Sequence, residues 1–176
     1  MKKRLLILGG NQEALEGIKV LKNFFLIILV DGNKNCVSRK VCDYFINANI
    51  YNTKEIIEKL NIFLKKKKLT IDGAVAMACD DVLTIATINK LYKLRGVNLN
   101  QAKVTNNKIK FKKILHKYKI NSPKYFVIKS FKEAKNKFKL FKSKKIIIKP
   151  PDNIGPDQSL VFQHFQNLAY VLFYFS

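Results

Sequence analysis

The chain has 176 residues, of which 48% are hydrophobic and 11% aromatic, so it can build a packed core and lacks the composition of a disordered protein. Lys and Arg number 34 against 12 Asp and Glu, giving a formal net charge of +22. This charge predicts attraction to polyanions. Arg, the residue that reads bases bidentately, is scarce, so we expect no sequence-specific nucleic-acid partner. No run reaches the roughly 18 apolar residues of a membrane helix, so we expect no membrane partner.

The cysteine and histidine residues do not form a recognisable metal site. Cys36, Cys42 and Cys79 are at spacings that match neither a zinc site nor a redox pair, and we interpret them as reduced thiols of a cytoplasmic protein. His116 and His164 have no Cys or His at ligand spacing, so the sequence predicts no metal ligands among them.

The first hundred residues alternate between apolar runs, which are typical of buried strands, and amphipathic helical stretches. We expect strands at 4–8, 26–30, 44–47 and 72–77. We expect helices that begin at Asn11 or Gln12, at Thr53 as the N-cap, and at Asp80 or Asp81. This alternation predicts a Rossmann-like, doubly wound α/β domain over residues 1–100, with a parallel sheet of about four strands.

The pattern changes from about residue 101 onward. Thr105 is the expected cap of a Lys-rich helix over 106–118, and a strand over 125–129 follows a turn. Ser130 and Glu133 form the capping-box pattern at the start of another helix. We then expect a strand over 145–149, a loop over 150–158, a strand over 159–162 and a final apolar helix at about 166–175. The sequence thus predicts a second, antiparallel and incomplete α+β unit over residues 101–176.

Several residues of the first unit lie where parallel strands end and ligands commonly bind. Gly9 and Gly10 separate a strand from a helix, a place where backbone N–H groups often hold phosphates. Asp31 ends the second strand, near where an acid would hold the ribose of a dinucleotide. The full G-x-G-x-x-G pattern is missing, and a tight turn explains the two glycines as well. Asp80 and Asp81 either cap a helix or line the ligand crevice.

Lys149 ends an Ile-Ile-Ile run and precedes a loop that is short of bulky side chains. A lysine placed in this way can act as a point charge on phosphate. Gly155 in the loop would let the backbone approach a phosphate closely. A plain hairpin with a lysine at the strand end is the alternative interpretation.

Several segments, taken together in chain order, resemble the N-terminal half of an ATP-grasp enzyme of the carbamoyl-phosphate-synthase or biotin-carboxylase-like group. They are LLILGGNQEALEGIKVLK, IILVDGN, VCDYFINANIYNTKEIIEKL, IDGAVAMACDDVLTIATINKL, NNKIKFKKILHKYKINSPKYFVIKSFKEA and IIIKPPDNIG. The resemblance covers nearly the whole chain. Its most specific part is NK-x-x-x-K-x-x-L, followed by SP and by IIIKP-x-DN-x-G.

The resemblance implies roles for both units. Residues 1 to about 100 would be the pre-ATP-grasp domain, with Gly9, Gly10, Asp31 and Asp80 on the acceptor-substrate side. Residues 101–176 would be the small lobe that closes over ATP.

Within this small lobe, the resemblance implies that Lys108 and Lys149 contact the nucleotide phosphates. Asp152, Asn153 and Gly155, in the loop after Lys149, would complete the ATP site. The loop departs from the family pattern directly after Gly155, where Pro-Asp-Gln replaces a small residue and a second glycine.

The implied cofactor is ATP with Mg²⁺, and the family's metal ligands belong to a large lobe that these 176 residues do not contain. We therefore expect a truncated ATP-dependent carboxylate–amine ligase that acts through an acylphosphate and is not catalytic alone. Its partner would be a second polypeptide with the large lobe, or another copy bound through the apolar C-terminal helix. The alternatives are a degenerate small-ligand or dinucleotide-binding module and a basic polyanion-binding protein.

Overall fold

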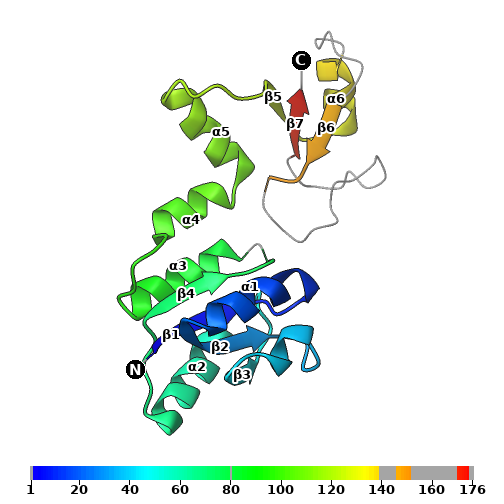
Figure 1. Cartoon of the computed structure of the whole chain (residues 1–176). Helices are drawn as coiled ribbons and strands as arrows, with labels where there is room; N and C mark the ends of the chain where they lie inside the picture. Colours follow the sequence, from blue (N-terminus) through cyan, green and yellow to red (C-terminus); the bar gives the residue numbers. More distant parts are fainter. Residues whose placement is uncertain (1, 80, 139–145, 152–169, 175–176) are drawn as a thin grey trace. The chain divides into compact units, whose positions relative to one another are not determined.

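The computed structural model describes residues 2–79, 81–138, 146–151 and 170–174 (Figure 1). The chain divides into two compact units, residues 1–102 and 103–176. No helix within the described ranges is both long and apolar enough to cross a membrane.

The first unit is an α/β domain built on a parallel sheet. Its strands pair in the order β3-β2-β1-β4, and all three pairings are parallel. This arrangement confirms the predicted Rossmann-like sheet. In chain order the elements are β1 (Lys3–Leu8), α1 (Gln12–Lys22), β2 (Phe25–Asp31), η1 (Val37–Lys40), β3 (Tyr44–Asn47), α2 (Thr53–Lys67), β4 (Gly73–Ala76), α3 (Val82–Leu91) and α4 (Leu99–Thr105), the last of which contains the boundary between the units.

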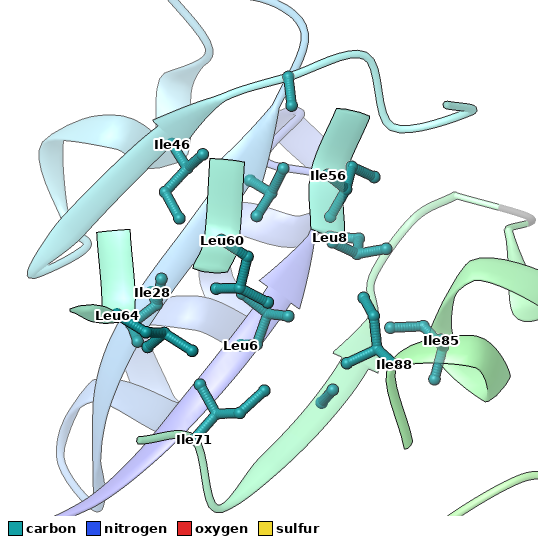
Figure 2. Packing of buried hydrophobic residues seen from close by; sticks show 13 residues of the cluster. Leu6, Leu8, Ile28, Ile46, Ile56, Leu60, Leu64, Ile71, Ile85 and Ile88 are labelled. Atoms are coloured by element: carbon teal, nitrogen blue, oxygen red, sulfur yellow. The ribbon is translucent and has the colours of Figure 1, made fainter. Parts of the chain in front are cut away.

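Helices cover both faces of this sheet, because successive side chains of a strand point to opposite faces. Leu6, Leu8 and Ile28 face one side, where they pack against α2 and α3, as Figure 2 shows. Leu5 and Ile7 face the other side, where α1 covers them. Burial on both faces explains why β1 and β2 are continuous apolar runs instead of alternating ones.

The helix starts of the first unit follow N-cap chemistry. Asn11 caps α1 and Asp81 caps α3, as the sequence predicted. The prediction for α2 was wrong by one residue: the cap is Asn52, whose side-chain oxygen accepts the Glu55 N–H at 3.1 Å. Thr53 is instead the first helical residue.

The second unit contains α5 (Lys108–Lys117), β5 (Tyr125–Ile128), α6 (Phe131–Phe138), β6 (Ile146–Lys149) and β7 (Tyr170–Tyr174). Its strands pair in the order β5-β7-β6, and both pairings are antiparallel. Ser130 Oγ accepts the Glu133 N–H at 3.2 Å, and the Glu133 carboxylate accepts the Lys129 N–H at 2.9 Å. These two hydrogen bonds close the start of α6 in the manner of a capping box. The difference is that the Glu133 carboxylate accepts the N–H of Lys129, the residue before Ser130, and not the N–H of Ser130 itself.

Two predictions for the second unit were wrong. Thr105 does not cap a helix over 106–118; it ends α4, and Asn107 caps the separate helix α5. The predicted final helix at about 166–175 is the strand β7 over Tyr170–Tyr174, which pairs with β5 and β6. Its Tyr, Val and Phe residues favour a strand, and two pairing partners outweigh helix formation. The predicted loop beyond residue 151 and strand over 159–162 lie outside the described residues.

Candidate functional site

The turn after β1 uses both glycines for close packing. Gly9 has φ of +88°, and a Cβ there would collide with the carbonyl oxygen of Met77. A Cβ on Gly10 would approach Leu29 and Cys36 to about 3 Å. The turn therefore brings α1 close to the sheet in a conformation that a side chain would disturb.

The N–H groups of this turn already have partners within the protein. Gly9 donates to the Val30 carbonyl at 3.0 Å, and Gly10 donates to Asp31 Oδ2 at 2.7 Å. Asp31 Oδ1 accepts the Asn33 N–H, also at 2.7 Å. One carboxylate thus joins the glycine turn to the loop after β2. Each of its oxygens accepts one backbone N–H and has a second acceptor site, so the role of Asp31 as a ribose ligand stays a prediction.

Two of the cysteines predicted to be reduced, Cys36 and Cys79, lie beside this turn. All three cysteines are thiols, and Cys36 is buried beside Gly10. Burial, with a smaller contribution from the Asp31 carboxylate, raises the pKa of the Cys36 thiol. Cys36 is therefore a protonated packing residue at neutral pH, not an activated nucleophile.

A cluster of hydroxyl groups joins the starts of α2 and α3, and the sequence did not predict it. Thr84 Oγ1 donates to Asp81 Oδ2 at 2.5 Å, and its oxygen lies 2.5 Å from Thr53 Oγ1. Thr84 is fully buried, so the chain of contacts fixes Asp81 at the carboxyl end of the sheet. Asp80, the other acid predicted here, lies outside the described residues. Of these two acids the structure therefore describes only Asp81, which caps α3.

In the second unit, the structure brings the segments of two predicted phosphate contacts together. The Lys108 N–H, at the first residue of α5, donates to the Pro151 carbonyl at 2.6 Å. Pro151 follows two residues after Lys149, the last residue of β6. Lys108 and Lys149 are thus anchored on adjoining backbone segments. Asp152, Asn153 and Gly155, predicted to complete the site, lie outside the described residues.

Another lysine of α5, Lys112, connects this helix to the loop before β5. Lys112 is buried, and its Nζ donates to the Pro123 carbonyl at 3.0 Å while lying 5.8 Å from the centre of the Tyr125 ring. Burial lowers the pKa of Lys112. The motif NK-x-x-x-K contains this residue, but a sequence pattern does not show that its ammonium group would fix the loop before β5.

The described residues do not form a metal site of their own. In the ranges that the structure describes, no group of three or more His, Cys, Asp or Glu side chains could hold a metal ion. Mg²⁺ prefers carboxylate and phosphate oxygens, and such a set of protein ligands is missing from this part of the chain. No step is therefore assigned to a metal.

Comparisons with known proteins agree on the fold. No family model matches the sequence, and no curated protein matches it. Solved structures do match. Phosphoribosylglycinamide synthetase from Anaerococcus prevotii superimposes with a TM-score of 0.67 and 24% identity, over 100% of this chain and 46% of that one.

Two further matches have other activities in their names. N5-carboxyaminoimidazole synthetase from Staphylococcus aureus, complexed with ADP, gives a TM-score of 0.72 at 12% identity, over 99% of this chain and 48% of that one. L-amino acid ligase from Bacillus licheniformis gives 0.65 at 14% identity, over 86% and 37%.

The chain spans less than half of the length of each of these proteins. It shares the fold of the part that it matches, and this agrees with the ATP-grasp-like fold that the sequence predicted. The finer likeness to carbamoyl-phosphate synthase or biotin carboxylase stays a prediction.

Proposed function

We propose that this chain binds ATP and is part of an ATP-dependent carboxylate–amine ligase that acts through an acylphosphate. The observation that carries the proposal is the hydrogen bond from Lys108 to Pro151, which holds the start of α5 against the exit of β6. Two lysines on adjoining segments would provide point charges for a polyphosphate. Asp152, Asn153 and Gly155 would complete this site, and ADP is named in the complex of one structural neighbour.

The acceptor substrate would bind at the carboxyl end of the parallel sheet in the first unit. Gly9 and Gly10 follow β1 and Asp31 ends β2 at this end, and Asp80, which the resemblance also assigns to the acceptor side, lies outside the described residues. The Gly9 and Gly10 N–H groups already donate hydrogen bonds within the protein. We therefore propose that the two glycines hold the turn at the end of β1 in place and do not bind phosphate themselves.

The proposed ligation needs a metal site in addition to the two lysines. The resemblance assigns the metal ligands to a large lobe, and the described part of the chain offers no such set. We propose that a large lobe completes the enzyme, and that the enzyme works in the cytoplasm, where the three thiols stay reduced.

The test is calorimetric titration of the chain with MgATP at moderate salt. Lys108→Ala and Lys149→Ala should each weaken binding by more than about 1 kcal/mol, the scale of a lost charged hydrogen bond. Lys110→Ala is the matched control, because it removes the same charge from an exposed position of the same helix.

Equal effects of all three substitutions would show attraction by net charge alone and would overturn the ATP site. Absence of saturable binding by the unaltered chain would overturn it as well.

A further inference from the structure

The charge of this protein is concentrated along one part of the chain. Between Asp81 and Glu133 no acidic residue occurs, while Lys or Arg occupies thirteen positions. The middle of this stretch is α5 with the loop that follows it to β5 (Figure 1). A segment this basic attracts anions, and the absence of acids within it leaves no local carboxylate to neutralise the lysines.

An open cavity of about 970 Å³ lies within this basic segment. Its walls come from the end of α5, the loop over residues 119–124 and the start of β5. Ile120, Tyr125 and Phe126 provide apolar surface, and Lys117 and Lys124 lie among the lining residues. Among the described residues, no acidic side chain lines it. The cavity therefore combines apolar and aromatic walls with positive charge.

Two lysine–aromatic pairs each include one residue that lines this cavity, Lys117 in one pair and Phe126 in the other. Lys117 Nζ lies 5.5 Å from the centre of the Tyr118 ring, and Lys137 Nζ lies 4.9 Å from the centre of the Phe126 ring. Tyr118 is 64% exposed, so most of its ring is open to a ligand. Phe111, two helical turns earlier on α5, is also exposed, at 42%. Contact points for negative charge and for flat rings thus lie within a few ångströms of each other.

Helix chemistry explains only part of this pattern. Lysines near the C-terminus of a helix complement its dipole, which accounts for Lys117. The dipole does not account for Lys119 and Lys124, which lie beyond the helix end. It also gives no reason to expose a tyrosine between the cations.

We propose that α5 and the loop over residues 119–124 bind single-stranded nucleic acid without sequence preference. Lys117, Lys119 and Lys124 would neutralise backbone phosphates, and Tyr118 would stack on an unpaired base. Lysine acts as a point charge and lacks the bidentate geometry with which Arg reads guanine, so this surface selects unpaired strands and not sequences. The site is separate from the proposed ATP site, which uses Lys108 and Lys149.

The test measures fluorescence anisotropy of a labelled twelve-nucleotide oligouridine with the full chain, over a series of salt concentrations. Replacing Lys117, Lys119 and Lys124 together by Gln should weaken binding at least about tenfold. It should also reduce the slope of log affinity against log salt by about 2, since each single-strand phosphate contributes about 0.7.

The matched control replaces Lys65, Lys66 and Lys67, in the last turn of α2, by Gln. It removes the same charge from the other unit and should change affinity by less than about threefold. Equal losses in the two triple variants would show diffuse attraction to a basic protein and would overturn the proposed surface.

Stacking is tested separately through Tyr118. Tyr118→Ala should weaken binding at least about fivefold, and Tyr118→Phe should retain it, because base stacking needs the ring and not the hydroxyl. Equal affinity of Tyr118→Ala and the unaltered chain would overturn the stacking role. Far-UV circular dichroism checks that each variant is folded.

Two further measurements use the unaltered chain and so do not depend on any variant folding. Cross-links from a thiouridine-substituted oligonucleotide should map to residues 111–126. Cross-links that map to the first unit instead would overturn the proposal. A duplex of the same length, or vesicles containing phosphatidylserine, should compete weakly. Stronger competition by either would identify a duplex or membrane surface instead.

Discussion

At the scale of single residues, Gly9 is the position where a side chain has the least room. Its φ is +88°, and a Cβ would collide with the Met77 carbonyl. Gly9→Ala should therefore lower the free energy of unfolding by about 2 kcal/mol or more, from backbone strain and steric conflict together. Gly32→Ala is the control: its Cβ would meet nothing closer than 3.7 Å, so it should be nearly neutral. Urea denaturation compares the two, and equal stability of both variants would contradict the packing role of Gly9.

Asp72 gives the protein a pH dependence that can be measured. Its carboxylate accepts hydrogen bonds from the Arg4 side chain and from the Arg4 N–H, each at 2.8 Å. These bonds lower the pKa of Asp72 in the folded state. A lowered pKa stabilises the fold above the unfolded value of about 3.9 and loses that effect as the pH falls through the folded value.

Asp72→Asn should therefore cost about 1 kcal/mol at pH 7, and the difference from the unaltered chain should close as the pH falls from about 5 to below 3. Denaturation at a series of pH values measures this gap. Glu16→Gln removes a carboxylate that is 76% exposed and paired with Lys19, and it should change stability little at any pH. A gap for Asp72→Asn that does not depend on pH would show that the ion pair is not its cause.

Residue types at the site were predictable, but their partners were not. The sequence identified Gly9, Gly10 and Asp31 by their places at strand ends. It gave no means to see that Asp31 accepts the Gly10 N–H, because the two residues are far apart in the chain and meet only when β1 and β2 pair. For the same reason the contact of Lys112 with Pro123 depends on tertiary folding. The grouping of Lys108 and Lys149 came from the resemblance alone.

At the scale of secondary-structure elements, the hydroxyl of Thr84 connects two helix starts. It donates to the Asp81 cap of α3 and contacts Thr53 at the start of α2. Thr84→Val keeps the volume but removes this connection in a fully buried place, so it should cost about 1–2 kcal/mol. Thr87→Val removes a hydroxyl that only bonds to Leu83 within the same helix, and it should cost clearly less. Thermal unfolding ranks the two, and the reverse order would contradict a connecting role.

Elements with strong local signals were predicted well, and those decided by distant partners were not. The uninterrupted apolar runs of β1 and β2 indicated buried parallel strands, because both faces of the sheet are covered. The helix α4 was missed because it is short, with Ala102 its one buried residue, and so shows little periodicity. The apolar run of β7 has neither a helical nor a strand period, and pairing on both sides decided its structure.

At the scale of the whole molecule, the first unit contains both apolar clusters of its sheet. We therefore expect a fragment of residues 1–102 to fold on its own and to unfold in one cooperative transition. Circular dichroism during heating, together with limited proteolysis, measures this. A fragment without a cooperative transition would mean that the stability of the first unit depends on residues 103–176.

The order of strands in the second sheet has a consequence for how the protein is made. The central strand, β7, is the last of the three along the chain, while its neighbours β5 and β6 precede it. During synthesis the first unit can fold as soon as Ala102 is available, whereas the second sheet stays without its central strand for roughly 70 residues more. At the usual rate this delay is about 4–14 s. A translating ribosome would thus carry a finished domain followed by two strand edges open to chaperones or to neighbouring chains.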